Sequence, residues 1–346
     1  MDVKKIIAKA LSEQTLTEDE IVAVLSTTDK ELLDELFCSA REARTKYFGN
    51  KIFLYGFVYF STWCRNNCSF CYYRSSNQNT IRYRKSGAEV RKIARELAAS
   101  GVHLLDLTMG EDPQYHQENF TGVLELVEQI REDNHLPIMI SPGVVSNELI
   151  ERFIACGVDF YALYQETYNR DLFKNLRLHQ SFDERMNAKV YARSKGMHIE
   201  EGLMTGLGET VEDLAAALLA MGQLDASQLR VMTFVPQNGT PLEKMEPQNH
   251  DMELKIIAMI RLLYPEVLIP ASLDVEGLAG LTSRIMAGSN VVTSIIPPAS
   301  GLAGVAQSTM DVDDGSRTVA GVTPHLESMG LRIATVDEYK DWLATH

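Results

Sequence analysis

The chain has 346 residues, of which 45% are hydrophobic, and a formal net charge of -14. This length and apolar content suffice for a large domain with a sizeable core. The negative charge is spread along the chain, which argues against nucleic acid or an anionic membrane as the main partner and favours a small-molecule ligand.

The N-terminal segment predicts helices rather than a targeting signal. Residues 4–47 alternate apolar and charged residues at helical spacing, without the apolar core of a secretion signal. No stretch approaches the ~18 consecutive apolar residues of a membrane span. We therefore expect a cytoplasmic protein whose five cysteines stay reduced. Residues 1–48 are expected to pack on a main domain that spans residues 49–346.

Short apolar runs alternate with helical stretches along the rest of the chain. Between the first two runs, residues 89–100 carry apolar side chains at helical spacing, and Gly101 ends that helix. The apolar runs are Ile52–Phe60, His103–Met109, Leu136–Ser141, Asp159–Gln165, Ile199–Gly206, Leu229–Val235, Val267–Asp274 and Asn290–Pro297.

The number of alternations selects the fold class. About eight strand–helix units in ~250 residues form a closed barrel, and strands that are apolar on both faces are typical of a parallel sheet covered by helices. A doubly wound open sheet is the alternative, but a cysteine loop stands where its glycine-rich turn often lies. We predict an α/β protein, a (β/α)8 TIM barrel with an N-terminal helical extension.

Three of the five cysteines lie in one short loop directly after the first predicted strand. Cys64, Cys68 and Cys71 have the spacing C-x3-C-x2-C. A structural zinc site needs a fourth ligand, and Cys38 and Cys156 lie far away on predicted helices. Incidental packing suits those two cysteines better than three thiols flanked by polar residues. The third interpretation is a [4Fe–4S] cluster with three thiolate ligands and one iron open to a ligand.

The cysteine loop resembles the signature of the radical S-adenosylmethionine (SAM) superfamily, in which an aromatic residue, here Phe70, precedes the last cysteine. The resemblance implies that SAM chelates the open iron and yields a 5′-deoxyadenosyl radical. It also implies SAM contacts in three further segments that resemble the biotin-synthase-like branch. The implied residues are Phe70, Met109, Glu111, Glu166 and Arg185. Phe70 and Trp63 are both expected to line the wall beside the cluster.

A comparison with biotin synthase inside that branch favours a reaction that needs only the radical. Thr108, Met139 and Glu200 align with the extra cysteines that hold the sulfur-donating cluster of biotin synthase. Sulfur insertion is therefore disfavoured.

Charged residues within barrel strands point to a zwitterionic substrate, since such residues are costly unless paired or functional. Arg230 offers a fork to a carboxylate, while Asp106 and Asp274 attract ammonium groups, and Ser272 shares a face with Asp274. This set complements a diamino acid such as lysine or ornithine. The alternative is an internal ion-pair network, for example between Arg230 and one aspartate.

Longer motifs narrow the resemblance to one family. "YFSTWCRNNCSFCYY", "LDLTMGEDP", "LRVMTFVPQ" and "LIPASLDVEG", within a match from about Tyr47 to about Pro298, resemble the 3-methylornithine synthases of pyrrolysine biosynthesis. The resemblance implies isomerisation of L-lysine to (3R)-3-methyl-D-ornithine by hydrogen abstraction at Cγ, fragmentation and recombination. It also implies that Cys64, Cys68 and Cys71 hold the cluster. The amino acid would be held by Asp106, Arg230, Ser272 and Asp274.

The same resemblance implies an electron-transfer partner of the flavodoxin or ferredoxin type, and we expect a monomer. Another biotin-synthase-like radical SAM enzyme with a different amino-acid substrate stays an alternative. A zinc-stabilised binding module is the non-enzymatic alternative. The loop "RSSNQNT" and the tail after Gly301 resemble no known motif.

Overall fold

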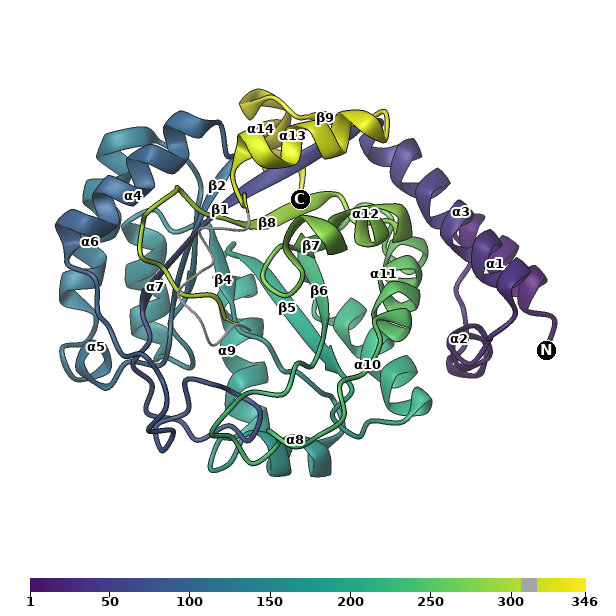
Figure 1. The fold of residues 1–346 in the computed structure, drawn as a ribbon, viewed down its shortest axis with the longest axis horizontal. Coiled ribbons are helices and arrows are strands. Elements are labelled where there is room, and N and C mark those ends of the chain that lie inside the picture. The colour runs from purple at the N-terminus through teal and green to yellow at the C-terminus, as the bar shows by residue number, and fades with distance from the viewer. Residues whose placement is uncertain (306–315) are drawn as a thin grey trace.

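Eight parallel strands form the barrel in the computed structural model, which describes residues 1–305 and 316–346. All eight predicted strands are present, most of them shorter than the apolar runs (Figure 1). They are β1 (Lys51–Ser61), β2 (Leu104–Met109), β3 (Ile138–Ser141), β4 (Phe160–Ala162), β5 (His198–Thr205), β6 (Gln228–Thr233), β7 (Pro270–Ser272) and β8 (Val291–Ile295).

The strand order confirms the predicted barrel. Within the described residues the strands follow the order β6-β5-β4-β3-β2-β1-β8-β7, and every neighbouring pair is parallel. The ring closes between β6 and the residues just before β7. There the Leu229 amide donates to the Leu268 carbonyl over 3.0 Å, and the Leu268 amide donates to Ser227 over 3.0 Å.

Helices cover the outside of the barrel, as the amphipathic pattern predicts. Ser181 and Thr210 cap two of these helices, because the side chain of each accepts a bond from an otherwise orphan amide at the helix start. The covering helices are α4 (Gly87–Ser100), α6 (Thr121–Asn134), α7 (Asn147–Ala155), α9 (Phe182–Ser194), α10 (Val211–Gln223), α11 (Asp251–Leu263) and α12 (Gly277–Ala287). Short helices α5 (Pro113–Gln117) and α8 (Arg170–Leu176) lie in the loops.

Three N-terminal helices, α1 (Val3–Leu11), α2 (Glu18–Leu25) and α3 (Lys30–Phe48), lie against one side of the barrel (Figure 1). Helix α3 packs on α11 and α12, and α2 packs on α10. Lys255 of α11 donates to the Leu25 and Thr27 carbonyls over 2.9 and 2.8 Å. These contacts place the extension on the barrel wall.

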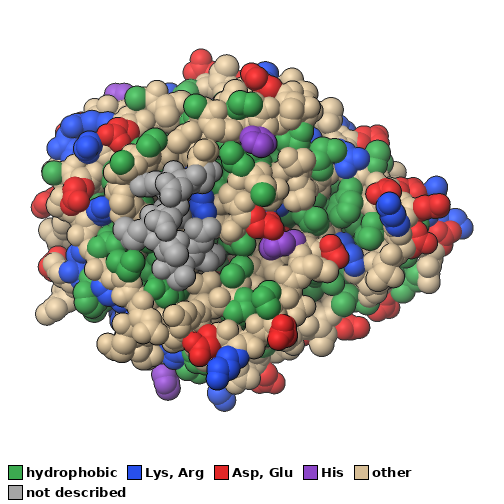
Figure 2. Space-filling view, viewed as in Figure 1, with side chains coloured by type: hydrophobic (Ala, Val, Ile, Leu, Met, Phe, Trp, Pro, Cys, Tyr) green, Lys and Arg blue, Asp and Glu red, His purple; other side chains and the backbone are tan. Residues whose placement is uncertain are grey.

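Acidic and basic side chains are interspersed over the face of the molecule that Figure 2 shows.

The C-terminal segment closes the end of the barrel at which the strands begin. It contains α13 (Val319–Ser328), β9 (Arg332–Ile333) and α14 (Val336–Thr345), and β9 pairs with the start of β1. Tyr339 of α14 is fully buried, and its hydroxyl lies 2.7 Å from that of Tyr55 inside the barrel. The sequence did not predict this role. Residues 306–315, also part of that tail, lie outside the described residues.

The C-terminal segment covers only one end of the barrel, so the opposite end is available for a site. In Figure 1, α13 and α14 lie at the top of the view, and the long loop after β1 lies at the lower left. Loops at the C-terminal ends of parallel strands carry the chemistry of such barrels. Within residues 1–305 and 316–346, no helix is both long and apolar enough to cross a bilayer.

Candidate active site

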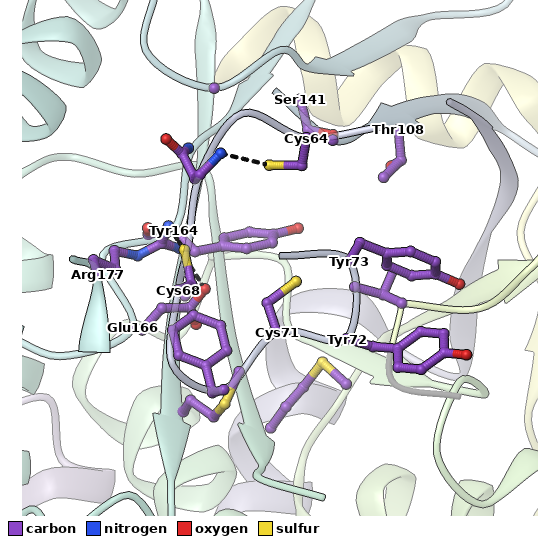
Figure 3. Close-up of a pocket in the computed structure, with 18 of the residues that line it drawn as sticks. Cys64, Cys68, Cys71, Tyr72, Tyr73, Thr108, Ser141, Tyr164, Glu166 and Arg177 are labelled. Carbon is purple, nitrogen blue, oxygen red and sulfur yellow. Dashed lines mark hydrogen bonds and ion pairs between the residues drawn. The ribbon is translucent and has the colours of Figure 1, made fainter. Parts of the chain in front are cut away.

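A cavity of about 230 Å³ lies at the C-terminal end of the barrel. Its walls come from the loop after β1 and from residues at or near the ends of β2 to β6. All three clustered cysteines line it, and Figure 3 shows them around a shared space. The predicted cysteine loop therefore opens into the barrel mouth.

The three thiols lie in different local environments. Cys68 is buried, and its Sγ accepts from Gln180 Nε2 at 3.0 Å and lies 3.8 Å from Arg177 Nη1. Burial raises the pKa of the Cys64 thiol to about 11, and it raises that of Cys71 further. The raised pKa values mean that Cys64 and Cys71 are protonated at neutral pH unless a bound cation compensates for their burial.

Side chains from neighbouring segments hold the loop in place. Asp112, fully buried, accepts from Ser61 Oγ over 2.5 Å and from Arg84 Nε over 2.7 Å. Arg82 donates to the Thr62 carbonyl over 2.5 Å. The "RSSNQNT" segment is fastened too, because Asn77 Nδ2 donates to the Asn238 carbonyl over 2.9 Å. The loop is thus tied to β1, to the turn after β2 and to the loop after β6.

All five residues predicted to contact SAM line this cavity. Arg185 Nη1 lies 3.4 Å from Glu111 Oε1, and its Nη2 donates to the Tyr164 carbonyl over 2.8 Å. Burial and the nearby Arg177 lower the pKa of Arg185 to about 10. Glu166 accepts from Arg177 Nη2 over 2.6 Å. The five members are Phe70, Met109, Glu111, Glu166 and Arg185.

A glycine lets Glu111 reach its position. Gly143 has φ +81°, and a Cβ there would lie 2.0 Å from Glu111 Cγ. Both the backbone conformation and the close approach require glycine. The segment "SPG" after β3 therefore shapes the same wall as the "MGED" turn after β2.

Of the four residues predicted to bind substrate, only Arg230 lines the cavity. Asp106 accepts from Thr108 Oγ1 over 2.7 Å. Burial, with the charge of Glu200, raises the pKa of Asp106 to about 7. Asp106 is buried outside that lining, as are Ser272 and Asp274 at the end of β7.

Asp274 is bound by a residue from the C-terminal segment. Arg317 Nη1 lies 3.3 Å from Asp274 Oδ1, and Arg317 Nη2 donates to the Asp274 carbonyl over 3.0 Å. The Ser272 and Ser294 hydroxyls lie 3.2 Å apart. The alternative Arg230–aspartate pair is absent from the described residues. Instead, Arg230 Nε donates to Glu200 Oε1 over 2.7 Å.

Comparison with known proteins identifies the family. Residues 58–220 match the model of the radical SAM superfamily. The chain is 43% identical to the 3-methylornithine synthases of Methanosarcina acetivorans, over 98% of this chain and 96% of the relative, and of Methanosarcina barkeri, over 96% and 94%. The crystal structure of a methylornithine synthase superposes with a TM-score of 0.92 at 43% identity, covering 97% of this chain and 99% of that one.

The chain belongs to the 3-methylornithine synthase family of radical SAM enzymes. The [FeFe] hydrogenase maturase subunit HydE of Thermotoga maritima is more distant, at 29% identity over 83% of this chain and 82% of the relative. Membership in the radical SAM superfamily implies an iron–sulfur cluster and SAM as cofactors, a small-molecule substrate and a need for a reductant.

The cavity of this methylornithine synthase family member fits such a cofactor pair. Within the described ranges, no three histidine, cysteine or acidic side chains converge closely enough for a single metal ion. Three thiols nevertheless face one space, which suits a multi-iron cluster, because a cluster spaces its thiolates more widely than one ion does. The donors beside Cys68 would stabilise the negative charge of a thiolate-bound cluster.

Sequence reasoning missed three of the residues that organise this family member's site. Arg177 and Gln180 approach Cys68 from the segment between α8 and α9, more than a hundred residues along the chain. Glu200 was noted only as a position that aligns with a biotin synthase cysteine. The sequence feature that could have indicated Glu200 is an acidic residue at an inward-facing strand position, because a buried carboxylate requires a buried partner.

One expectation about this wall was wrong. Phe70 lines the cavity, whereas Trp63 is absent from the described lining and its side chain is 41% exposed. Gly110 approaches the backbone of Trp63 closely, since a Cβ there would lie 2.3 Å from the Trp63 carbonyl oxygen. The backbone of Trp63 packs against the turn after β2, and its ring points outward.

Proposed function

We propose that this protein converts L-lysine to (3R)-3-methyl-D-ornithine, a step of pyrrolysine biosynthesis. The observation that carries the proposal is that one cavity joins three cysteine thiols to Arg230, in a chain 43% identical to 3-methylornithine synthases over nearly its whole length. A radical source and a carboxylate-binding group in one enclosed space suit a radical reaction on an amino acid.

Cys64, Cys68 and Cys71 would ligate a [4Fe–4S] cluster and leave one iron open to SAM. When bound and reduced, this pair supplies a 5′-deoxyadenosyl radical that abstracts hydrogen from an unactivated carbon. The protein contributes binding, orientation and exclusion of water. Arg177 and Gln180 help to balance the negative charge around Cys68, at 3.8 and 3.0 Å from its sulfur.

Charged groups close to Cys68 match the two ends of a methionyl group. Arg185 suits a carboxylate, because its guanidinium is held in a fixed orientation. Its Nη2 donates to the Tyr164 carbonyl, and its Nη1 donates to Gln180 Oε1 over 3.2 Å. Glu111 suits an ammonium group, and Gly143 gives it room. Arg177 holds Glu166 close to Arg185 and Glu111. We assign Phe70 and Met109 to the apolar contacts with SAM.

Arg230 is the group best placed to bind the carboxylate of lysine. Its Nε is held by Glu200, and its Nη1 donates to Thr293 Oγ1 over 3.3 Å. Within the described chain, Nη2 has no hydrogen-bond partner, so this nitrogen is available to a carboxylate from the cavity. Asp106 and Asp274 would attract the two ammonium groups, with Ser272 beside Asp274.

The enclosure serves the reaction itself. A substrate that fragments and recombines must keep its parts together, and tightly packed walls hold reacting groups in a productive geometry. Tyr73 is buried and Tyr164 is partly buried, and both line the cavity, which favours such confinement. The reaction also needs an electron from a flavodoxin- or ferredoxin-type partner, and we propose that the enzyme acts as a monomer.

An anaerobic assay tests this function. The protein is reconstituted with iron and sulfide, reduced with dithionite, and supplied with SAM and lysine; amino acids and 5′-deoxyadenosine are then quantified. We expect 3-methylornithine. Absence of SAM cleavage would refute the radical chemistry. SAM cleavage with unchanged lysine would favour the alternative, in which this protein is a radical SAM enzyme that acts on a different amino acid. Cys68→Ala should lose the cluster absorption, whereas Asp274→Asn should keep it and convert lysine poorly.

A further inference from the structure

The exposed ring of Trp63 lies close to two guanidinium groups. Arg82 Cζ is 5.8 Å and Arg84 Cζ is 5.7 Å from the ring centroid, within the range of cation–π attraction. Trp63 directly precedes Cys64 in the chain. An aromatic side chain that is 41% exposed is thus fixed in orientation one residue from a cavity cysteine.

A second large apolar side chain is exposed next to this segment. Ile81 is 44% exposed, and its carbonyl accepts from Thr62 Oγ1 over 3.0 Å, which places it beside the backbone that leads into Trp63. Isolated exposed apolar residues are ordinary, but these two lie on neighbouring segments of one loop that the Thr62–Ile81 hydrogen bond joins. We call Trp63, Ile81, Arg65, Arg82 and Arg84 the Trp63 patch.

The loop that carries the patch differs in charge from the rest of the protein. Residues 62–86 contain five Lys and Arg and no Asp or Glu, so the remainder of the chain carries -19 against the overall -14. Arg65 and Arg84 pair with Glu111 and Asp112, which are buried, so the guanidinium groups form the outer side of both pairs. The patch is a cationic surface on an anionic protein.

Arg82 adds a charge that no acid neutralises in the described ranges. Its guanidinium donates only to backbone carbonyls, those of Thr62, Tyr73 and Arg74, over 2.5, 2.9 and 2.7 Å. These bonds hold the group in place without cancelling its charge. A fixed, uncompensated cation beside an exposed tryptophan has the composition that dominates binding energy at protein interfaces.

We propose that the Trp63 patch docks a small acidic electron-carrier protein and delivers its electron to the cysteine loop. The inference rests on the proposed function, which requires a one-electron reductant. Fixed cations steer an acidic partner, while Trp63 and Ile81 supply the apolar contact. Docking here places the donor against the residue next to Cys64, so the electron crosses little protein. The carrier is oxidised by one electron and the iron–sulfur centre is reduced by one.

Opposite substitutions at Ile81 test the docking site. The reconstituted holoenzyme is titrated with reduced flavodoxin, and the initial rate of 5′-deoxyadenosine formation gives the KM for flavodoxin. Ile81→Glu is expected to raise this KM about tenfold and Ile81→Lys to lower it, whereas dithionite-driven rates stay unchanged in both. Structural damage would shift both variants in the same direction. Equal KM values for both variants and the wild type would overturn the proposal.

A control and a binding readout separate this test from the proposed function. Val190 of α9 is 54% exposed, so Val190→Glu adds the same charge elsewhere and should leave the flavodoxin KM unchanged. Calorimetric binding of flavodoxin to the holoenzyme needs no turnover, and its affinity should fall with Ile81→Glu and with added salt. If lysine is not the substrate, this binding difference still stands. Binding that is equal in Ile81→Glu and Val190→Glu would refute the docking site.

Discussion

Arg230 and Glu200 form a buried ion pair inside the barrel, with Nε and Oε1 2.7 Å apart. Glu200 is fully buried and also accepts from the Tyr164 hydroxyl over 2.8 Å and from Gln228 Nε2 over 2.7 Å. Three donors therefore hold one carboxylate, which in turn fixes one edge of the Arg230 guanidinium. The pair gives the buried arginine the counter-charge that it requires. It also orients the guanidinium so that Nη2 of Arg230 faces the cavity.

Glu200→Gln should impair lysine use without loss of the cluster. The substitution leaves the Arg230 charge buried without its partner, so we expect a lower melting temperature and at least a tenfold loss of kcat/KM for lysine. Tyr164→Phe removes only one donor to Glu200 and serves as the milder comparison. Ultraviolet–visible absorption monitors the cluster. A Glu200→Gln variant with wild-type kcat/KM would contradict the positioning role.

Lysine use should rise with pH through the titration of Asp106. Burial and Glu200 raise the pKa of this carboxyl to about 7, so the charged form that attracts an ammonium group predominates only above neutral pH. We expect kcat/KM for lysine to increase between pH 6 and 8, and this component to be missing in Asp106→Asn. An identical pH profile in the variant would exclude Asp106 as the titrating group.

The same raised pKa predicts an opposite trend in stability. The folded protein holds this proton at pH values where the unfolded chain, with its ordinary acid pKa, has released it. The free energy of unfolding of the ligand-free protein should therefore fall as pH rises from about 4 to about 7. Asp106→Asn should lack this component and be more stable than the wild type at pH 8, as measured by thermal unfolding.

Lys189 and Glu201 form a second buried pair, directly behind the SAM-site candidates. Both side chains are fully buried, and Glu201 Oε1 accepts from the Gln165 amide over 2.7 Å. Lys189→Met should cost about 3–5 kcal/mol because it leaves a buried carboxylate without its cation. The double variant Lys189→Met/Glu201→Gln should lose less than the sum of the single variants in chemical denaturation. Additive losses would show that the two residues do not interact.

Gly143→Ala should weaken SAM binding by displacing Glu111. The new Cβ would overlap Glu111 Cγ and would also sit on a backbone with φ +81°. Gly101 separates the two effects, because it has φ +95° but a Cβ added there would meet no atom within 4 Å. Gly101→Ala should cost only the ~1 kcal/mol of backbone strain and leave SAM affinity unchanged. Equilibrium dialysis of SAM with the reconstituted proteins compares the two variants.

Gln180→Leu should shift the reduction potential of the cluster. Gln180 donates to Cys68 Sγ over 3.0 Å, and hydrogen bonds to ligand sulfurs stabilise the more negative, reduced cluster. We expect a lower potential in a redox titration followed by electron paramagnetic resonance, with cluster content unchanged. An unshifted potential would mean that the contact is not kept in the loaded enzyme.

Local patterns in the sequence determined the architecture and the outline of the site. The eight apolar runs became the eight strands, because buried parallel strands need apolar residues on both faces wherever they occur. Cys64, Cys68 and Cys71 lie within eight residues of one another, so their spacing alone predicts that they share a space. Glu111, Glu166 and Arg185 follow strand ends, and a parallel barrel brings its strand ends to one mouth.

Only the tertiary structure decided which side chains meet across the barrel. The register of β5 and β6 sets Glu200 opposite Gln228 and Arg230 opposite Gly202, so Arg230 reaches Glu200 diagonally across the two strands, and no local pattern specifies that choice over Asp106. Likewise, Arg177 reaches Cys68 from over a hundred residues away, and the Trp63 side chain is 41% exposed although its backbone packs against Gly110. Periodicity and spacing depend on neighbours in the chain, whereas these contacts depend on strand register and on the packing of distant segments.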